Sequence, residues 1–174
     1  NWAITGFNGQ NNYWGRFLRF HPTAINGDLT IGSMNNVYTN TGPIYICNKN
    51  GYTNVGITRP DGDNPSSLFG RDVDFSSDGS VLVISERDAP NNNKGAVHVY
   101  HEKVVNQNKI DHQLKFTISE DVVNSHFGVR IHLNNTGSLL TVTTGGISND
   151  ILQVWRLDQT SASKIDNVLI PTEY

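Results

Sequence analysis

The sequence predicts an all-β fold in which a four-stranded antiparallel unit is repeated three times. Short runs rich in β-branched and aromatic residues alternate along the chain with turns made of Gly, Asn, Asp and Ser. No window repeats apolar residues at positions i, i+3 and i+4, so the pattern argues against helices. The same order of strands and turns recurs three times, with 55 and then 58 residues between equivalent glycines.

The first strand of each copy begins with an aromatic residue followed by glycine. The equivalent glycines are Gly15, Gly70 and Gly128, and the strands after them read "RFLRF", "RDVDF" and "VRIHL". Apolar and polar side chains alternate in these runs, as expected of strands whose two faces meet different surroundings.

A tight turn and a second strand follow in each copy. The turns read "INGD", "SDGS" and "NTGS", and the second strands read "LTIGS", "VLVIS" and "LLTVTT". Asn-Gly and Asp-Gly favour two-residue hairpins because both central residues of such a turn need positive φ. We therefore expect the first two strands of each copy to form a hairpin.

A longer polar loop leads to the third strand, and a less regular fourth strand closes each copy. The third strands read "PIYIC", "AVHVY" and "LQVWRL", and the fourth lie near "YTNVGIT", "HQLKFTI" and "DNVLIP". One four-stranded meander cannot bury both of its faces, so the copies must stack on one another. The predicted units cover residues 13–67, 68–125 and 126–174.

The order Phe-Gly, strand, Asp-Gly turn, strand, loop and Gly-Ala-Val resembles the FG-GAP repeats of integrin-α-type β-propellers. The resemblance is close over residues 68–100 and partial over residues 13–47 and 126–157. It implies a β-propeller-like array of three four-stranded blades, a mostly extracellular or surface location, and roles in adhesion or in glycan and protein binding. Propellers usually have about four to eight blades, so three are not expected to close by themselves.

We expect residues 1–12 to form a lone strand and a connection, in addition to the three four-stranded blades. The run "NWAIT" precedes Trp14-Gly15 much as "LKFTI" precedes Phe127-Gly128. A chain with one additional strand either belongs to a longer propeller or donates that strand to a sheet edge of another chain. The chain begins without Met or an apolar leader, which favours a processed protein or a fragment.

The residues that bind calcium in integrin-type blades are missing here. Those blades often hold calcium in an Asp-rich loop between their first two strands, and the present turns offer at most Asp28 or Asp78 alone. Calcium takes about six to eight oxygen ligands, so we expect no metal. His98 and His101 should point to opposite faces of a strand, and the single cysteine, Cys47, excludes a cysteine-rich zinc site. No cofactor is predicted.

Ligand binding is expected in the loops. In the propellers that the repeats resemble, ligands approach the face with the loops between second and third strands and the connections between blades. Loops on a rigid scaffold commonly carry binding residues. The candidates on these loops are Asn35, Asn36, Tyr38, Glu86, Arg87, Asp88 and Asn91.

The sequence contains no contiguous catalytic motif. Nucleophile elbow, phosphate loop, HExxH and CxxC patterns are all missing. The carboxylate pairs Asp61/Asp63 and Glu86/Asp88 would suit a glycosidase only if one of them flanked a sugar cleft. Arginines adjoin both pairs, so we interpret them as solvated ion pairs.

These observations together predict a non-enzymatic protein. A net charge of −3 disfavours a surface that follows nucleic-acid phosphates, and no apolar run reaches the roughly 18 residues of a membrane span. We expect an extracellular, virion-surface or filament-surface structural and adhesion module that self-associates through blade edges or by strand donation. A glycan-binding propeller lectin is the alternative, and a glycoside-cleaving enzyme comes third.

Overall fold

Within the residues that it describes, the computed structural model contains twelve β-strands and no helix. No helix of this described part is therefore long and apolar enough to cross a membrane. The predicted all-β class and the antiparallel pairing of strands in fours are confirmed. The additional strand predicted within residues 1–12 lies outside the described residues. Those residues are 13–20, 29–34, 44–48, 51–57, 60, 68–88, 93–106, 109–145 and 151–169.

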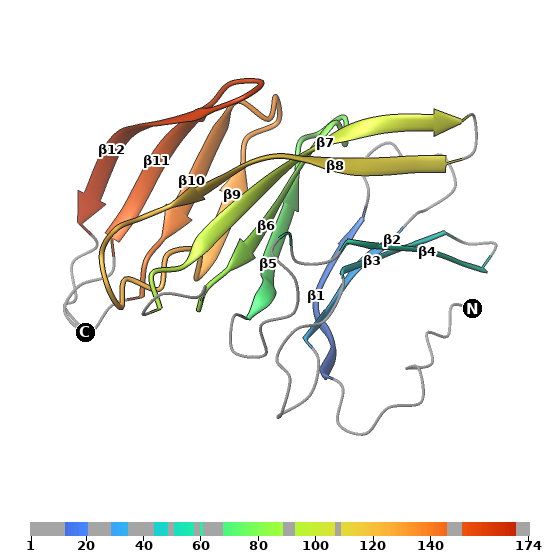
Figure 1. Ribbon diagram of the computed structural model, residues 1–174, viewed down its shortest axis with the longest axis horizontal. Coiled ribbons are helices and arrows are strands. Elements are labelled where there is room, and N and C mark those ends of the chain that lie inside the picture. The colour runs from blue at the N-terminus through green and yellow to red at the C-terminus, as the bar shows by residue number, and fades with distance from the viewer. Residues whose placement is uncertain are drawn as a thin grey trace.

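Each sheet contains four consecutive strands that pair with their neighbours in the chain. Sheet 1 consists of β1 (Tyr13–Phe20), β2 (Leu29–Met34), β3 (Ile44–Asn48) and β4 (Gly51–Ile57). Sheet 2 consists of β5 (Phe69–Phe75), β6 (Val81–Glu86), β7 (Ala96–Asn106) and β8 (Lys109–Ser119). Sheet 3 consists of β9 (Arg130–Leu133), β10 (Leu139–Thr143), β11 (Ile151–Leu157) and β12 (Ala162–Leu169). Figure 1 shows sheet 2 between the other two.

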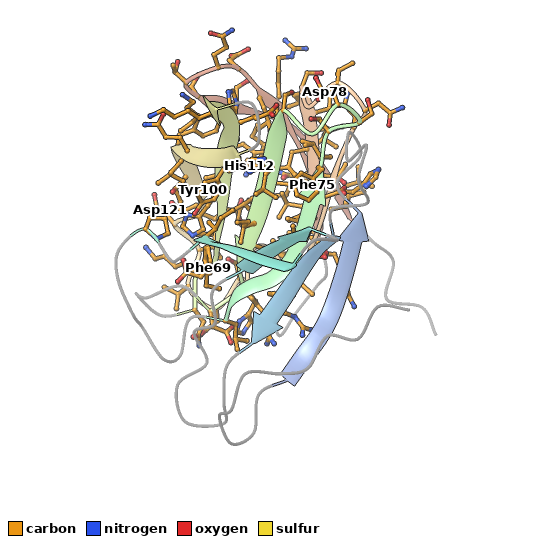
Figure 2. All side chains as sticks on the ribbon, turned by 90° about the vertical axis from the view of Figure 1, so that its right-hand side faces the viewer. Phe69, Phe75, Asp78, Tyr100, His112 and Asp121 are labelled. Carbon is orange, nitrogen blue, oxygen red and sulfur yellow. The ribbon has the colours of Figure 1, made fainter. Side chains whose placement is uncertain are left out.

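We call the first strands of the sheets, β1, β5 and β9, the inner strands. Strand β5 contacts both β1 and β9. At the hairpin end of sheets 2 and 3, described turns join β5 to β6 (residues 76–80), β9 to β10 (residues 134–138) and β11 to β12 (residues 158–161). At the loop end lie the connections from second to third strands and from one sheet to the next. In Figure 2, Asp78 lies at the hairpin end of sheet 2 and Phe69 lies toward its loop end.

Strand β6 of sheet 2 is covered on both of its faces. All six residues of β6 are buried. Leu82 and Ile84 join an apolar cluster that includes Ile57 of sheet 1. Val81 and Val83 join a second cluster, formed largely with sheet 3. A strand with two covered faces reads as a continuous apolar run, which explains "VLVIS".

The Phe-Gly pair marks an irregularity of the inner strands. The pairing register shifts just after this pair on β5, and at the equivalent place on β1. Gly70 and Gly128 have φ of 78° and 93°, a conformation that costs glycine little. A Cβ on Gly128 would also lie 3.0 Å from the Cβ of Ser85. Glycine at this position therefore lets sheet 3 pack closely on sheet 2.

Asp78 organises the turn between β5 and β6. Its Oδ1 accepts hydrogen bonds from the Ser76 hydroxyl at 2.6 Å, the Ser80 hydroxyl at 2.7 Å and the Ser80 amide at 3.0 Å. These bonds, the one from the Ser76 hydroxyl above all, lower the pKa of Asp78 from 3.8 to about 2. Gly79 next to it has a φ of 74°. The lone acid of the "SSDGS" turn thus has a structural role.

The carboxylate of Asp78 should make the contribution of this turn to stability depend on pH. Its pKa is lower in the folded chain, about 2, than the ordinary 3.8, so the contribution is complete above 3.8 and is lost as pH falls toward 2. We expect Asp78→Asn to lower the urea midpoint at about pH 6. The difference in urea midpoint between the variant and the wild type should disappear in acid. Asp158→Asn, in the exposed β11–β12 turn, is the control and should leave the urea midpoint at about pH 6 close to that of the wild type. If the difference in urea midpoint between Asp78→Asn and the wild type stayed constant down to about pH 2, the role assigned to the Asp78 carboxylate would be wrong.

Candidate functional site

The structure describes three of the seven predicted ligand-binding residues. Glu86 is the last residue of β6, and Arg87 and Asp88 follow it at the loop end of sheet 2. The other four, Asn35, Asn36, Tyr38 and Asn91, lie outside the described residues, as does the carboxylate pair Asp61/Asp63.

Glu86 does not lie in a loop, so its predicted placement was wrong. Its side chain is 1% exposed, and Oε2 lies 2.8 Å from Nε2 of His98. The other ring nitrogen of His98 lies 2.9 Å from the hydroxyl of Thr117, and the ring of Phe69 packs against the imidazole. The cause is local: β6 continues through Glu86, which pairs with Phe69 and Ala96, so its side chain points into the protein. Glu86 and His98 form a buried pair beneath the loop end.

Asp88 instead makes a contact at the surface of the loop end. Its Oδ1 lies 2.7 Å from Nδ1 of His126, and the two side chains are 20% and 17% exposed. The Nε atom of Arg87 lies 3.4 Å from the same carboxylate oxygen. Asp88 follows β6, whereas His126 lies in the connection between sheets 2 and 3, so stacking of the sheets brings together residues 38 apart in the chain.

The backbone around His126 is held in an unusual conformation. His126 has a φ of 47°, and the neighbouring Asn124 and Asn93 have φ of 57° and 56°. Residues other than glycine rarely adopt positive φ, and such residues are frequent at functional sites. The amide of His126 donates to the carbonyl of Asn93 at 3.0 Å, and the Asn93 amide group donates to Oδ1 of Asn124 at 3.3 Å. Gly95 packs so tightly on Phe127 that a Cβ there would collide with its backbone.

The Asp88–His126 pair has the geometry of an oriented general base. A carboxylate at Nδ1 fixes the tautomer and the ring direction of a histidine, which leaves Nε2 for proton transfer. Sequence reasoning missed His126. Its signal was position: histidine stands directly before Phe-Gly, where the other copies have Tyr13 and Leu68. Leu68 also has a positive φ, of 52°. The backbone conformation of His126 therefore recurs in the second copy, whereas the imidazole is present only in the third.

A second polar arrangement lies where the inner strands of sheets 2 and 3 meet. Asp72 accepts the amide of Val73 with Oδ1 at 3.0 Å and that of Ile131 with Oδ2 at 3.1 Å. Asp74 accepts the amide of Phe75 at 3.0 Å and that of Leu133 at 2.9 Å in the same way. Each carboxylate therefore joins the open edges of β5 and β9.

His132 extends this arrangement toward solvent. Its Nδ1 lies 2.8 Å from Oδ2 of Asp74, and its side chain is 78% exposed. Within the described part of the chain, no three His, Cys, Asp or Glu residues are grouped so that they could hold a metal ion. The polar groups here join sheets and orient histidines.

The strand pairing defines the class as an all-β chain of four-stranded antiparallel sheets. No protein-family model matches the chain, and no curated protein does. A solved structure that shares this fold is a candidate 6-phosphogluconolactonase from Bacteroides fragilis NCTC 9343. It is 19% identical, with a TM-score of 0.56 over 88% of this chain, and the chain spans 41% of the length of that structure. At this identity the likeness establishes the fold.

This neighbour contradicts the function predicted from the sequence. We expected a non-enzymatic structural and adhesion module, with a lectin as the alternative, and the structure of the same fold carries the name of an enzyme. We withdraw that prediction, together with the prediction that the chain is not an enzyme. A contiguous motif could not indicate the contact between Asp88 and His126, because these residues meet only through the stacking of two sheets.

Proposed function

We propose that the three sheets are successive blades of a β-propeller of FG-GAP type, and that the loop end of sheets 2 and 3 hydrolyses a sugar lactone. The contacts among the inner strands support the propeller arrangement, because they collect equivalent loops at one end. The proposed activity rests on the contact between Asp88 and His126. The name of the solved neighbour suggests the substrate class, a phosphorylated gluconolactone.

In the proposed reaction, His126 acts as a general base. Nε2 takes a proton from a water molecule while the water oxygen attacks the lactone carbonyl carbon. The bond between that carbon and the ring oxygen then breaks, and the imidazolium returns its proton to the ring oxygen to give a hydroxy acid. Asp88 holds the tautomer and stabilises the imidazolium that forms between these steps. Arg87, beside Asp88, adds a positive charge near the developing oxyanion.

The test is hydrolysis of 6-phosphogluconolactone and of gluconolactone, followed in a pH-stat above the spontaneous rate. We expect His126→Gln to lower kcat by about 100-fold with little change in KM, since a positioned general base contributes about 10²–10⁴ in rate. Asp88→Asn should also lower kcat, because it removes the group that fixes the tautomer. Circular dichroism of each variant checks that it is folded.

His132→Gln is the matched control for this test. His132 also has a carboxylate at Nδ1, but it lies on β9 and takes no part in the proposed reaction. Its kcat should equal that of the wild type. Either no turnover above the spontaneous rate by the wild-type chain, or equal loss in His126→Gln and His132→Gln, would refute the assignment of His126.

A further inference from the structure

We infer that Asn93, near the end of the connection between β6 and β7, is a positioning residue for the imidazole of His126. It acts through its backbone. A left-handed conformation, with a φ of 56°, directs the Asn93 carbonyl at the amide of His126, and this contact keeps the imidazole on Asp88. The consequence for catalysis rests on the proposed function, in which His126 is the general base.

His126 needs a restraint from outside its own segment, because its backbone conformation is unfavourable by itself. Its φ is 47°, a value that residues with a Cβ rarely adopt and that persists only where surrounding contacts fix it. A change of φ would move Cβ and the ring with it, and would take Nδ1 away from Oδ1 of Asp88, now at 2.7 Å. The contacts that fix φ at His126 therefore also fix the direction of its imidazole.

The restraint comes from the end of the β6–β7 connection. The amide of His126 donates to the carbonyl of Asn93 at 3.0 Å. The next carbonyl, that of Lys94, accepts the amide of Phe127 at 3.1 Å and the hydroxyl of Ser125 at 2.7 Å. Two consecutive carbonyls of sheet 2 therefore bond His126 and both of its neighbours in the chain, and the Asn93 carbonyl is the one that holds the amide of His126 itself.

Asparagine suits this position because it tolerates the conformation that the contact needs. Asparagine adopts positive φ more readily than most residues with a Cβ, whereas β-branched residues hardly adopt it. The side-chain amide of Asn93 also donates to Oδ1 of Asn124 at 3.3 Å, but both residues are exposed, so water can replace this bond. The carbonyl of Asn93, rather than its side chain, is thus the group that positions His126.

One connection supplies both contacts of His126. Asp88 follows β6 and Asn93 precedes β7, so the β6–β7 connection bonds the imidazole with one residue and the backbone amide with another. A carboxylate selects one tautomer of histidine only while the ring nitrogen stays within hydrogen-bond distance. Loss of the Asn93 contact would therefore leave the base present but misdirected, which slows proton transfer without removing any group that binds substrate.

The experiment compares two substitutions that separate the backbone of Asn93 from its side chain. Asn93→Gly permits the positive φ and keeps the carbonyl in place, whereas Asn93→Val favours negative φ and turns the carbonyl away. Nitrogen-15 NMR spectra of the histidine rings, assigned with His126→Gln, report without any substrate which ring nitrogen of neutral His126 carries the proton. We expect the proton on Nδ1 in the wild type and in Asn93→Gly, and a mixture of tautomers in Asn93→Val. In Asn93→Val, kcat should fall at least about tenfold with little change in KM, because a misplacement of about 1 Å can cost about 100-fold.

Leu68→Val is the matched control, because Leu68 has a φ of 52° at the equivalent place in the second copy. Valine there creates the same backbone conflict away from the imidazole, so the tautomer of His126 and kcat should match the wild type. Circular dichroism checks folding, and Asn93→Ala, which disfavours positive φ less strongly, should give an intermediate mixture of tautomers if Asn93→Val does not fold.

The outcomes separate this inference from the proposed function. A mixture of tautomers in Asn93→Val, with no lactone hydrolysis by the wild type, would support the positioning of His126 while refuting the activity. An unchanged tautomer in Asn93→Val would overturn the inference, whatever the activity of the wild type. Equal changes in Asn93→Val and Leu68→Val, or in Asn93→Val and Asn93→Gly, would overturn it as well.

Discussion

Replacing His98 by alanine is expected to lower the free energy of unfolding by about 3–5 kcal/mol, because it removes the imidazole that lies 2.8 Å from the buried carboxylate of Glu86. Glu86 is 1% exposed and His98 2% exposed, so water cannot replace the lost contact. The change also removes the hydrogen bond to Thr117 and the packing on Phe69. Urea unfolding, followed by tryptophan fluorescence, measures the effect.

The double variant Glu86→Leu with His98→Leu is the informative control. Replacement of a buried pair by apolar residues of similar size is often neutral, so the double variant should be more stable than either single change. His101→Ala, on the same strand but less buried, should cost much less. A loss below about 1 kcal/mol for His98→Ala would show that the pair contributes nothing beyond its packing.

Replacing Asp72 by alanine is expected to destabilise the chain by about 2–4 kcal/mol, since the amides of Val73 and Ile131 both lose their acceptor. Asp72 is 4% exposed, so no water can bond these amides at the contact between β5 and β9. Asp72→Asn retains one acceptor oxygen and should fall between alanine and wild type. The free energy of unfolding in urea is again the measurement.

Asp166→Ala provides the comparison for Asp72. Its carboxylate also accepts the amide of the following residue, Asn167, at 2.8 Å, but it lies exposed on β12. We expect a loss within about 0.5 kcal/mol, as for most exposed substitutions. Equal losses for Asp72→Ala and Asp166→Ala would mean that the bond from Asp72 to sheet 3 adds no stability.

The strands were predictable because their signals are local. Runs such as "VLVIS" and "AVHVY", and the Asp-Gly turn at Gly79, depend on residues within a few positions of one another. Asp88 was correctly placed at the loop end for the same reason. The prediction placed Glu86 in a loop because the strand was expected to end before this residue. Strand β6 instead continues through Glu86, and the side chain points inward.

The sequence by itself determined the all-β class, the repeat and the turns, since each follows from backbone preference and alternation along a short stretch of chain. Tertiary structure alone decided which polar groups meet. His126 reaches Asp88 across 38 residues, and Asp72 reaches Ile131 across 59, because stacking brings equivalent positions of neighbouring sheets together. The spacing of the repeat indicates that sheets stack. Which side chain then finds which partner depends on the distance between sheets and on the close approach that Gly128 permits.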